Sequence, residues 1–389
     1  MNAKRLAPLL LSVLLASLLA GCGQQQDPQT PPPAQQEEPG AVEPVTTGSA
    51  QEVLAQLSTE EKVAQLFLLS PEALDGAEQV TALSDSARKR LKDCPAGGIL
   101  FSPGNLEDPD QLTKLMDSLT KAAKVPPLFV IQGEDTSPFA GLSGFQPPQV
   151  PTSGAIGATG DPAKAKDAAV ALGGFLRELG FHLTLAPVAD VTTDPALNVR
   201  AFSSNPEQAA MMISAAAEGF HQAGLGCTLT HFPGIGGAAR DAATGFLTTP
   251  KTWQEMLTWE IYPFQAGMAG GADAVLVSHL TTPNAAQQGD LPASLSREMI
   301  TGKLRGELRF ARVIVTDSLS DPAITSAYEP GQAALMAFQA GADLLLQPED
   351  LTAAYDTLLT AVKEGTVSQQ RLDESVLRIL QLKEKYDLL

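Results

Sequence analysis

The fold is decided by the stretch Gly226-Cys227-Thr228-Leu229-Thr230-His231-Phe232-Pro233-Gly234-Ile235-Gly236. Its first five residues form a short apolar run, which is typical of a buried strand in a parallel sheet. The run gives way to His231 and then to a proline and two glycines, which indicate a loop. A polar side chain therefore follows directly where this strand ends.

Seven further apolar runs lie along the chain, and amphipathic helical patterns separate most of them. The eight runs cover residues 65–69, 98–101, 128–132, 182–186, 226–230, 274–278, 313–316 and 343–346. The helical patterns cover 108–123, 162–179, 206–223, 252–269, 297–308, 351–364 and 368–386. Length alone allows one domain or two, but this alternation favours a closed parallel barrel over a doubly wound sheet. We therefore expect residues 51–389 to form one α/β domain, a (β/α)8 barrel of the TIM type.

A barrel of this type carries its active site on the loops that follow the carboxyl ends of the strands. The polar residues at these positions are Glu134, Asp190, His231, His279, Asp317 and Glu349, which follow the third to the eighth runs in order. Each of them alone could be structural, because carboxylates often cap helices and a single histidine is often a core residue. Together they form a ring that converges on one mouth, which predicts a binding or catalytic site.

The N-terminus has the pattern of an export signal. Lys4 and Arg5 precede a mostly apolar stretch at residues 6–20, which is too short for a stable membrane span. The stretch ends in Leu19-Ala20-Gly21-Cys22, which resembles a bacterial lipobox. We expect residues 1–21 to be the signal peptide and Cys22 to carry lipid. An ordinary secretory signal or a short anchor helix is the alternative.

Residues 23–50 are rich in Gln, Pro and Glu, and they are almost free of large apolar side chains. Such a segment cannot bury enough surface to offset its ordering entropy, so residues 22–50 are interpreted as a lipidated cysteine and a disordered tether. The expected location is extracytoplasmic, on a bacterial cell membrane, through the lipid on Cys22.

Net charge, cysteine content and the lack of cofactor motifs limit the kinds of ligand and partner that we expect. The formal net charge of −18 argues against nucleic acid and against docking on anionic lipid through basic patches. Cys94 and Cys227 could pair in an oxidising compartment, yet each lies beside an apolar run and buried free thiols are as consistent with that setting. No metal-ligand spacing, phosphate loop or dinucleotide fingerprint is present in the sequence, so no cofactor and no metal are implied. We expect a monomer.

Read from Thr230 to Gly236, the opening stretch resembles the Lys-His-Phe-Pro-Gly-His-Gly segment of glycoside hydrolase family 3, in its β-N-acetylhexosaminidase branch. Val315-Thr316-Asp317 resembles the strand end that carries the nucleophile of that family. Further similar segments follow in family order at residues 57–67, 98–101, 151–162, 186–191, 200–202, 278–279, 292–296 and 371–376. The resemblance thus extends over the whole of the expected folded part.

The resemblance implies a retaining mechanism on terminal β-linked N-acetylglucosamine in cell-wall or related amino-sugar glycans. Asp317 matches the nucleophile, although an aspartate before a serine would also suit a helix cap. Arg200 and His231 match sugar contacts of the family. The mouth residues Gln132, Glu134, Asp190 and His279 complete the expected substrate-binding set.

The chain departs from the family at the residues that transfer protons. Asp241 stands where the orienting aspartate of an Asp-His dyad belongs, but Ala243 occupies the position of the histidine. The acid/base role is therefore lost or moved to another carboxyl group, Asp241 or Glu134, whose pKa a shielded mouth can raise. General acid/base catalysis is worth about 10²–10⁴-fold, so its loss slows turnover without erasing it.

Four other positions of the sugar-binding pattern also differ from the family. Thr230 replaces a lysine, Ile235 a histidine, Gln132 an acidic anchor and Ser137 an arginine. The sequence therefore predicts a lipid-anchored β-N-acetylhexosaminidase of weak or altered activity. A catalytically inactive descendant that binds glycan or a protein partner is the alternative. A transporter's solute-binding lipoprotein is disfavoured, because eight strand–helix units leave no second lobe.

Overall fold

The computed structural model describes residues 49–194 and 199–389. The expected signal peptide, Cys22 and all but two residues of the expected tether lie outside these ranges. Helix α1 (Ser49–Gln56) begins inside the tether as it was predicted. Ala50 is fully buried, and the backbone N–H and the hydroxyl of Ser49 donate hydrogen bonds of 3.0 and 3.1 Å to Glu384. Residues 49 and 50, which were predicted to belong to the tether, are therefore part of the fold.

Eight short strands form the barrel, and every neighbouring pair is parallel. They are β1 (Phe67–Leu69), β2 (Gly98–Phe101), β3 (Leu128–Ile131), β4 (Leu183–Thr184), β5 (Gly226–Phe232), β8 (Ala274–Val277), β9 (Val313–Thr316) and β10 (Leu345–Leu346). The sheet order is β10-β1-β2-β3-β4-β5-β8-β9. A bridge between Val315 and Leu344 joins the two ends of the sheet, where the Thr316 N–H donates to the Leu344 carbonyl at 3.0 Å. The predicted (β/α)8 barrel is confirmed.

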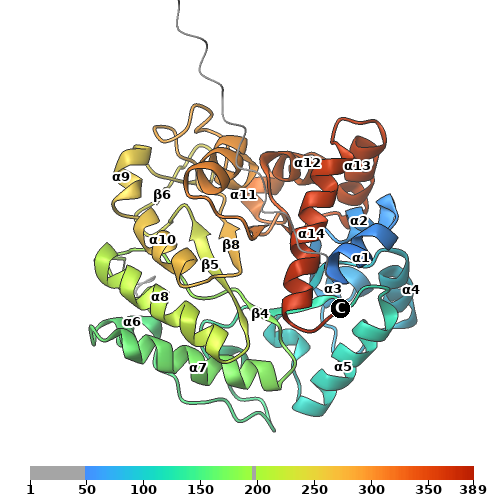
Figure 1. Ribbon diagram of the computed structural model, residues 1–389, viewed down its shortest axis with the longest axis horizontal. Coiled ribbons are helices and arrows are strands. Elements are labelled where there is room, and N and C mark those ends of the chain that lie inside the picture. The colour runs from blue at the N-terminus through green and yellow to red at the C-terminus, as the bar shows by residue number, and fades with distance from the viewer. Residues whose placement is uncertain (1–48, 195–198) are drawn as a thin grey trace, which may run out of the picture. The chain divides into compact units, whose positions relative to one another are not determined.

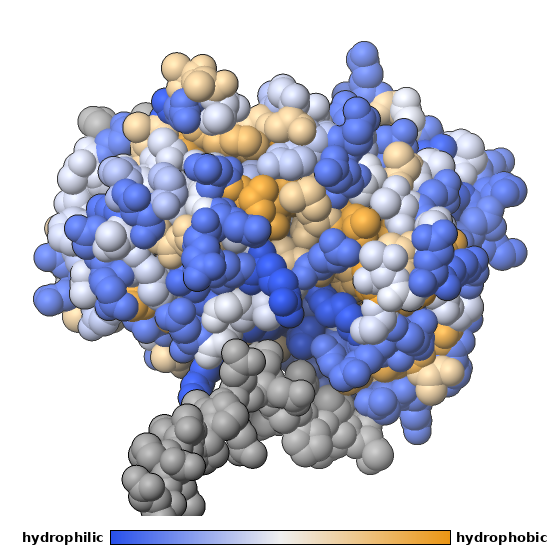
Figure 2. All heavy atoms as spheres, turned by 90° about the horizontal axis from the view of Figure 1, so that it is seen from above, coloured by the Kyte–Doolittle hydropathy of each residue, from blue (hydrophilic) through white to orange (hydrophobic). Residues whose placement is uncertain are grey.

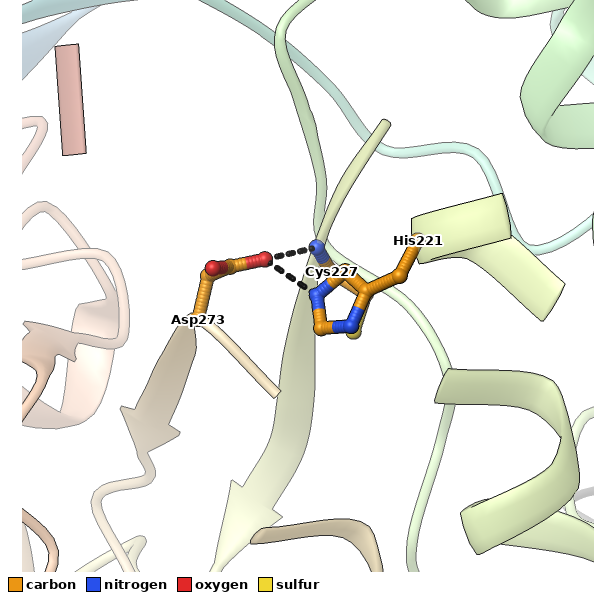
Figure 3. A group of neighbouring side chains, drawn as sticks. All are labelled: His221, Cys227 and Asp273. Atoms are coloured by element: carbon orange, nitrogen blue, oxygen red, sulfur yellow. Dashed lines mark hydrogen bonds and ion pairs between the residues drawn. The ribbon is translucent and has the colours of Figure 1, made fainter. Parts of the chain in front are cut away.

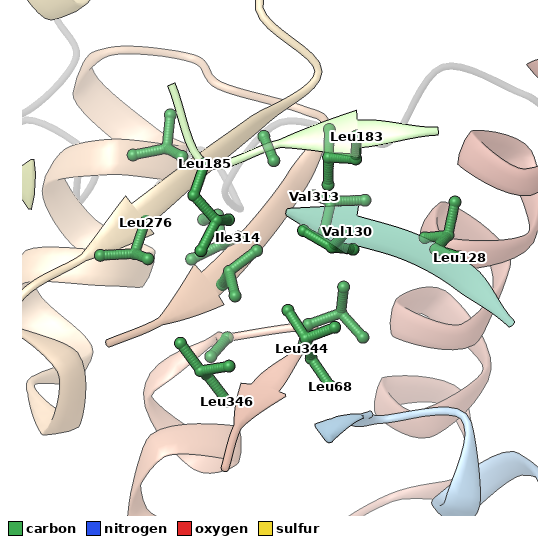
Figure 4. Close-up of a cluster of buried hydrophobic side chains, with 14 of the residues drawn as sticks. Leu68, Leu128, Val130, Leu183, Leu185, Leu276, Val313, Ile314, Leu344 and Leu346 are labelled. Atoms are coloured by element: carbon green, nitrogen blue, oxygen red, sulfur yellow. The ribbon is translucent and has the colours of Figure 1, made fainter. Parts of the chain in front are cut away.

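Strands of this barrel are almost entirely buried, because side chains fill the barrel on one face and helices cover the other. Figure 4 shows leucine, valine and isoleucine side chains from several strands gathered in one cluster, among them Leu68, Val130 and Ile314. This packing explains why the strands read as continuous apolar runs rather than as alternating patterns. Seven of the eight runs contain the whole strand that was predicted from them, and β5 extends two residues beyond its run, through His231 and Phe232.

Long helices lie on the outside, with α7 and α8 on one side and α13 and α14 on another (Figure 1). The long helices are α5 (Pro109–Ala122), α7 (Pro162–Glu178), α8 (Pro206–Gln222), α12 (Pro330–Ala340), α13 (Leu351–Lys363) and α14 (Gln369–Lys385). A Ser, Asp or Asn side chain caps the first turn of each of these except α12, and proline occupies the first position of α5, α7, α8 and α12. None of the helices in the described ranges is both long and apolar enough to cross a membrane.

Shorter elements connect these parts. They are α2 (Thr59–Ala64), α3 (Pro71–Asp75), α4 (Asp85–Asp93), α6 (Ser153–Gly157), α11 (Pro322–Thr325) and the 3-10 turns η1 (Pro103–Asn105), η2 (Ser137–Phe139) and η3 (Ala293–Leu295). On the face of the molecule in Figure 2, hydrophilic residues surround smaller apolar patches.

Two predicted helices differ from the structure. The pattern at 252–269 forms two helices, α9 (Trp253–Leu257) and α10 (Ile261–Ala269), instead of one. Pro263 explains the break, because it has no N–H to bond the carbonyl four residues earlier, at Trp259. The pattern at 297–308 forms a π-helix, η4 (Glu298–Glu307), in which hydrogen bonds span five residues.

The last helix, α14, is hydrogen-bonded to the barrel through Asp343, a fully buried aspartate that precedes β10. Its carboxylate accepts hydrogen bonds from Arg305 on η4 and from Arg378 and Ser375 on α14. Burial opposes ionisation of Asp343, but the nearby arginines hold the pKa of this carboxyl below its usual value. A charged network thus closes the domain.

Candidate active site

The carboxyl ends of the strands bring the predicted polar residues to one mouth. Asp317 directly follows β9, and His231 is the second-last residue of β5. Phe232 pairs with Val277 of β8, and Val277 pairs with Thr316 of β9. Phe232 and Thr316 are therefore level with each other and two strands apart, which separates their backbones by about 10 Å. His231 comes one residue before Phe232 and Asp317 one residue after Thr316, so the backbone of Asp317 lies farther along the strand direction than that of His231.

Asp190 is brought to His231 by pairing between their segments. Val188 bridges Thr230, and the Ala189 N–H donates to the Thr230 carbonyl at 2.6 Å. The Asp190 carboxylate oxygen Oδ2 lies 2.8 Å from His231 Nδ1, and Oδ1 accepts from the Ile235 N–H at 2.8 Å. Asp190 therefore fixes both the ring of His231 and the loop that follows β5.

Two glycines allow that loop to lie so close. Gly234 has a φ of +110°, and a Cβ there would meet Glu260 at 2.6 Å. A Cβ on Gly236 would lie 2.2 Å from the carbonyl oxygen of Val191, the residue after Asp190. Side chains at either position would push the loop away from Asp190.

The environment of His231 favours its charged form. The ring is only 15% exposed, and burial by itself lowers the pKa of a histidine. The charge and hydrogen bond of Asp190, together with the charge of Asp317, outweigh burial and the opposing charge of Arg200. The pKa of His231 is therefore raised above its usual value. The charges of Asp190, Asp317 and Arg200 all act on His231, as is expected when the four side chains lie at one mouth.

Arg200 and Glu134 form a two-bonded ion pair. Arg200 Nε donates to Glu134 Oε2 at 2.6 Å, and a terminal nitrogen of the guanidinium donates to Oε1. Gln132, Glu134, Ser137 and Arg200 line a cleft of about 490 Å³ at the ends of β2 and β3. This volume lies in the range of small-molecule sites.

Asp317 has a carboxylate oxygen to spare. Oδ1 accepts from the Ser318 N–H at 2.9 Å, and the Asp317 N–H donates to the Val277 carbonyl at 2.8 Å. Among the described residues, none donates a hydrogen bond to Oδ2. Asp321, not Asp317, caps the next helix. The helix-cap interpretation of Asp317 is therefore excluded.

His279, one of the expected sugar contacts, supports the loop of Asp317. Its Nε2 donates to the Ser318 carbonyl at 2.8 Å, so its Nδ1 accepts from the Ser294 hydroxyl at 2.7 Å. Both ring nitrogens are thus occupied, and the residue is 9% exposed.

Asp241 lies on a hairpin formed by β6 (Ala239–Arg240) and β7 (Leu247–Thr248). Its carboxylate accepts from the Ala243 N–H at 2.7 Å, and its own N–H donates to the Phe246 carbonyl at 2.8 Å. These bonds shape the tip of the hairpin. Within the described ranges, Asp241 makes no hydrogen bond to Asp190, His231 or Asp317.

The remaining substituted positions differ in their surroundings. Thr230 is buried, and its hydroxyl has no hydrogen-bond partner in the described part of the chain. Ile235 packs against the core.

After the eighth strand, Gln347 lines the cleft. The predicted mouth residue Glu349 is exposed and does not line it. Gln347 directly follows its apolar run, which is the one signal that could have identified it.

A second cluster lies at the opposite ends of the strands, where His221, Cys227 and Asp273 meet (Figure 3). The three types of side chain can ligate a metal. However, Asp273 already accepts from His221 Nε2 at 2.7 Å, the Cys227 N–H at 3.2 Å, Tyr386 Oη at 2.8 Å and the Lys385 ammonium. The positive charge of Lys385 would repel a metal ion bound to Asp273. The cluster is therefore interpreted as a hydrogen-bond network that holds the end of α14 against the barrel. Cys94 and Cys227 are both free thiols.

Comparison with known proteins places this site in a family. A model of the glycosyl hydrolase family 3 N-terminal domain matches residues 58–382. A β-hexosaminidase of Stenotrophomonas maltophilia (strain R551-3) is 36% identical over 185 residues, which cover 46% of this chain and 54% of that protein. β-Hexosaminidase LpqI of Mycobacterium tuberculosis (strain ATCC 25618 / H37Rv) is 31% identical over 248 residues, 59% of this chain and 63% of LpqI.

Solved structures of family 3 enzymes are also similar to this chain. A family 3 β-N-acetylglucosaminidase from Paenibacillus sp. str. FPU-7 matches with a TM-score of 0.78 and 35% identity, over 85% of this chain and 63% of that one. The match spans about half the length of the first curated relatives. Because the family model covers most of the described residues, from the capped start of α2 almost to the end of α14, the chain belongs to glycosyl hydrolase family 3.

Proposed function

We propose that the protein is a retaining β-N-acetylglucosaminidase that removes terminal β-linked N-acetylglucosamine from cell-wall or related amino-sugar glycans. The observation that carries this proposal is Asp317, whose carboxylate keeps one oxygen without a donor among the described residues, at the barrel mouth that also holds the Asp190–His231 pair. An ionised carboxylate there can attack the anomeric carbon and stabilise positive charge on the sugar ring.

The cleft at the ends of β2 and β3 supports the choice of a sugar as substrate. Gln347 connects this cleft to the loop of Asp317, because its Oε1 lies 3.5 Å from the hydroxyl of Ser318. Arg200 is 38% exposed, although Glu134 holds its guanidinium in place, so part of it faces the cleft. Gln132 is exposed in the same cleft. These donors and acceptors suit hydroxyl and acetamido groups, which need hydrogen bonds with defined directions. The relatives named β-hexosaminidase and β-N-acetylglucosaminidase agree with an amino sugar.

Turnover should be weak on natural disaccharides. Ala243 stands on the hairpin where the family has its proton-donating histidine, and Asp241 is occupied in shaping the tip. Leaving groups such as nitrophenolate need little proton assistance, whereas a sugar alcohol needs much. We therefore expect measurable hydrolysis of activated β-N-acetylglucosaminides and far slower hydrolysis of natural linkages.

The location is also part of the proposal. The lipobox at Cys22 and the tether after it suit an extracytoplasmic protein held on a membrane by lipid. Cys22→Ser should release the protein from the membrane fraction of its host. A mutant that stays in the membrane pellet would argue against the anchor, while leaving the enzymatic proposal intact.

The experiment that tests the activity compares wild type with Asp317→Ala on p-nitrophenyl β-N-acetylglucosaminide. Asp321→Ala is a matched control, because Asp321 lies in the same loop but only caps α11. We expect Asp317→Ala to lose nearly all turnover and Asp321→Ala to keep it, with about 1 kcal/mol less stability. Equal rates in wild type and Asp317→Ala would favour a glycan- or partner-binding protein, the second candidate, which the loss of the family lysine and histidine at Thr230 and Ala243 supports.

A further inference from the structure

We propose that Asp190 and His231 form the proton-transfer dyad of this site and replace the family dyad that Ala243 has lost. The proposal rests on the glycosidase function proposed above. It assigns to His231 the delivery of a proton to the leaving oxygen and the later activation of water.

The geometry of the pair is that of an oriented acid/base. Asp190 binds His231 Nδ1 at 2.8 Å and is itself held by the Ile235 N–H, so the ring cannot turn freely. The carboxylate keeps a proton on Nδ1. Nε2 then carries a proton in the charged ring and a lone pair in the neutral ring. Among the described residues, Nε2 has no hydrogen-bond partner, so both states are available to a substrate.

His231 also has the position that the reaction needs. It lies near the end of β5, and Asp317 follows β9 on the other side of β8, close enough for its charge to act on His231. A sugar bound at the mouth can therefore meet both a nucleophile and a proton donor. Three other titratable side chains at or near the mouth, those of Glu134, His279 and Asp241, already have hydrogen-bond partners within the protein. Glu134 is held by two bonds to Arg200, and both nitrogens of His279 are occupied. Asp241 bonds the backbone of its own hairpin.

Charges from three directions act on His231. Asp190 after β4 and Asp317 after β9 favour the imidazolium, and Arg200, beyond Asp190 in sequence, opposes it. Burial opposes it as well. Because the acids prevail and raise the pKa, the protonated ring persists to higher pH than in an isolated histidine.

The reaction has two steps, formation of a glycosyl-enzyme on Asp317 and its hydrolysis. In the first, an Asp317 carboxylate oxygen forms a bond to C1 of the sugar while the C1–O bond to the aglycone breaks. The departing oxygen takes the Nε2 proton, so the aglycone leaves as an alcohol and His231 becomes neutral. In the second, water attacks C1, its proton moves to Nε2, and the C1–Asp317 bond breaks.

The test uses the full-length protein and a series of aryl β-N-acetylglucosaminides whose leaving groups become steadily less acidic. We expect His231→Gln to lose activity increasingly along the series, by about 10²–10⁴-fold at the poor end and far less at the activated end. Azide should rescue the activated substrates and give the glycosyl azide of β configuration, because azide attacks the glycosyl-enzyme without needing a base.

Asp190→Asn provides a second readout that folding defects do not mimic. We expect it to show the same leaving-group pattern, and we expect the alkaline limb of its pH–rate profile to move to lower pH. Equal losses across the series, no azide product and an unmoved alkaline limb would overturn the dyad and leave His231 a binding residue. Failure of the glycosidase proposal is distinguishable, since wild type and Asp317→Ala would then share one rate.

Discussion

Arg200 and Glu134 are joined by two hydrogen bonds at the edge of the barrel mouth, one of them 2.6 Å between Nε and Oε2. A planar guanidinium held on two nitrogens by a carboxylate has a fixed plane and direction. The partly exposed cation is thereby aimed at the cleft before any sugar arrives. Glu134, which sequence similarity marked as a substrate contact or an alternative acid, instead positions Arg200.

Glu134→Gln should therefore weaken substrate binding more than the chemical step. Loss of one charge-assisted bond leaves Arg200 free to change direction, at a cost of about 1–3 kcal/mol in binding. We expect KM for an activated β-N-acetylglucosaminide to rise about 5- to 150-fold, with a smaller change in kcat. Asp110→Asn, which removes an exposed carboxylate in the first turn of α5 that does not line the cleft, should change KM little. A kcat that falls while KM holds would instead assign a proton to Glu134.

Ala243→His tests whether the hairpin can recover the family dyad. Asp241 bonds the backbone N–H of residue 243, which does not depend on the side chain there. The new ring would lie near the Asp241 carboxylate on an exposed tip. We expect hydrolysis of natural disaccharides to increase more than hydrolysis of nitrophenyl substrates. A uniform change on both classes would show that the hairpin does not deliver a proton.

Asp343→Asn should destabilise the domain strongly. The carboxylate is fully buried between Arg305 and Arg378, and its loss leaves buried positive charge uncompensated. We expect the free energy of unfolding in urea to fall by about 3–5 kcal/mol. Asp117→Asn, on the exposed side of α5, should change it by less than about 0.5 kcal/mol. Similar effects in both variants would contradict the role of Asp343 as the fastening of α14.

Low pH should destabilise the protein, because two buried aspartates, Asp273 and Asp343, are ionised in the folded state. Burial works against ionisation of Asp273 and Asp343, but His221 and Lys385 lower the pKa of the first, and the arginines lower that of the second. The unfolded chain therefore takes up these protons first, at its ordinary pKa of about 3.9. Stability is fully present above that value and is lost as pH falls from about 5 toward the folded pKa values. Urea midpoints measured across this range should fall, and the fall should be shallower in Asp343→Asn.

The sequence predicted the barrel because each buried strand is an unbroken apolar run, and the site because polar residues follow those runs. Glu134, Asp190, His231 and Asp317 do lie at the mouth. Partnerships were harder to predict, since Asp190 and His231 are 41 residues apart and meet only through the register of Val188 with Thr230. Glu349 carries the charge that is typical of a site residue, but Gln347 directly follows the strand, and position at the strand end decides which side chain lines the cleft. The break at Pro263 was missed because the apolar period continues through it.

The most direct test of the central claim is the mass of the protein after reaction with an activated 5-fluoro-β-N-acetylglucosaminide. Fluorine destabilises the positive charge that develops on the sugar, so the covalent intermediate should accumulate. We predict a single adduct of one fluorinated sugar, and peptide mapping that assigns it to Asp317. No adduct on wild type in the presence of enzyme turnover, or an equal adduct on Asp317→Ala, would contradict the account.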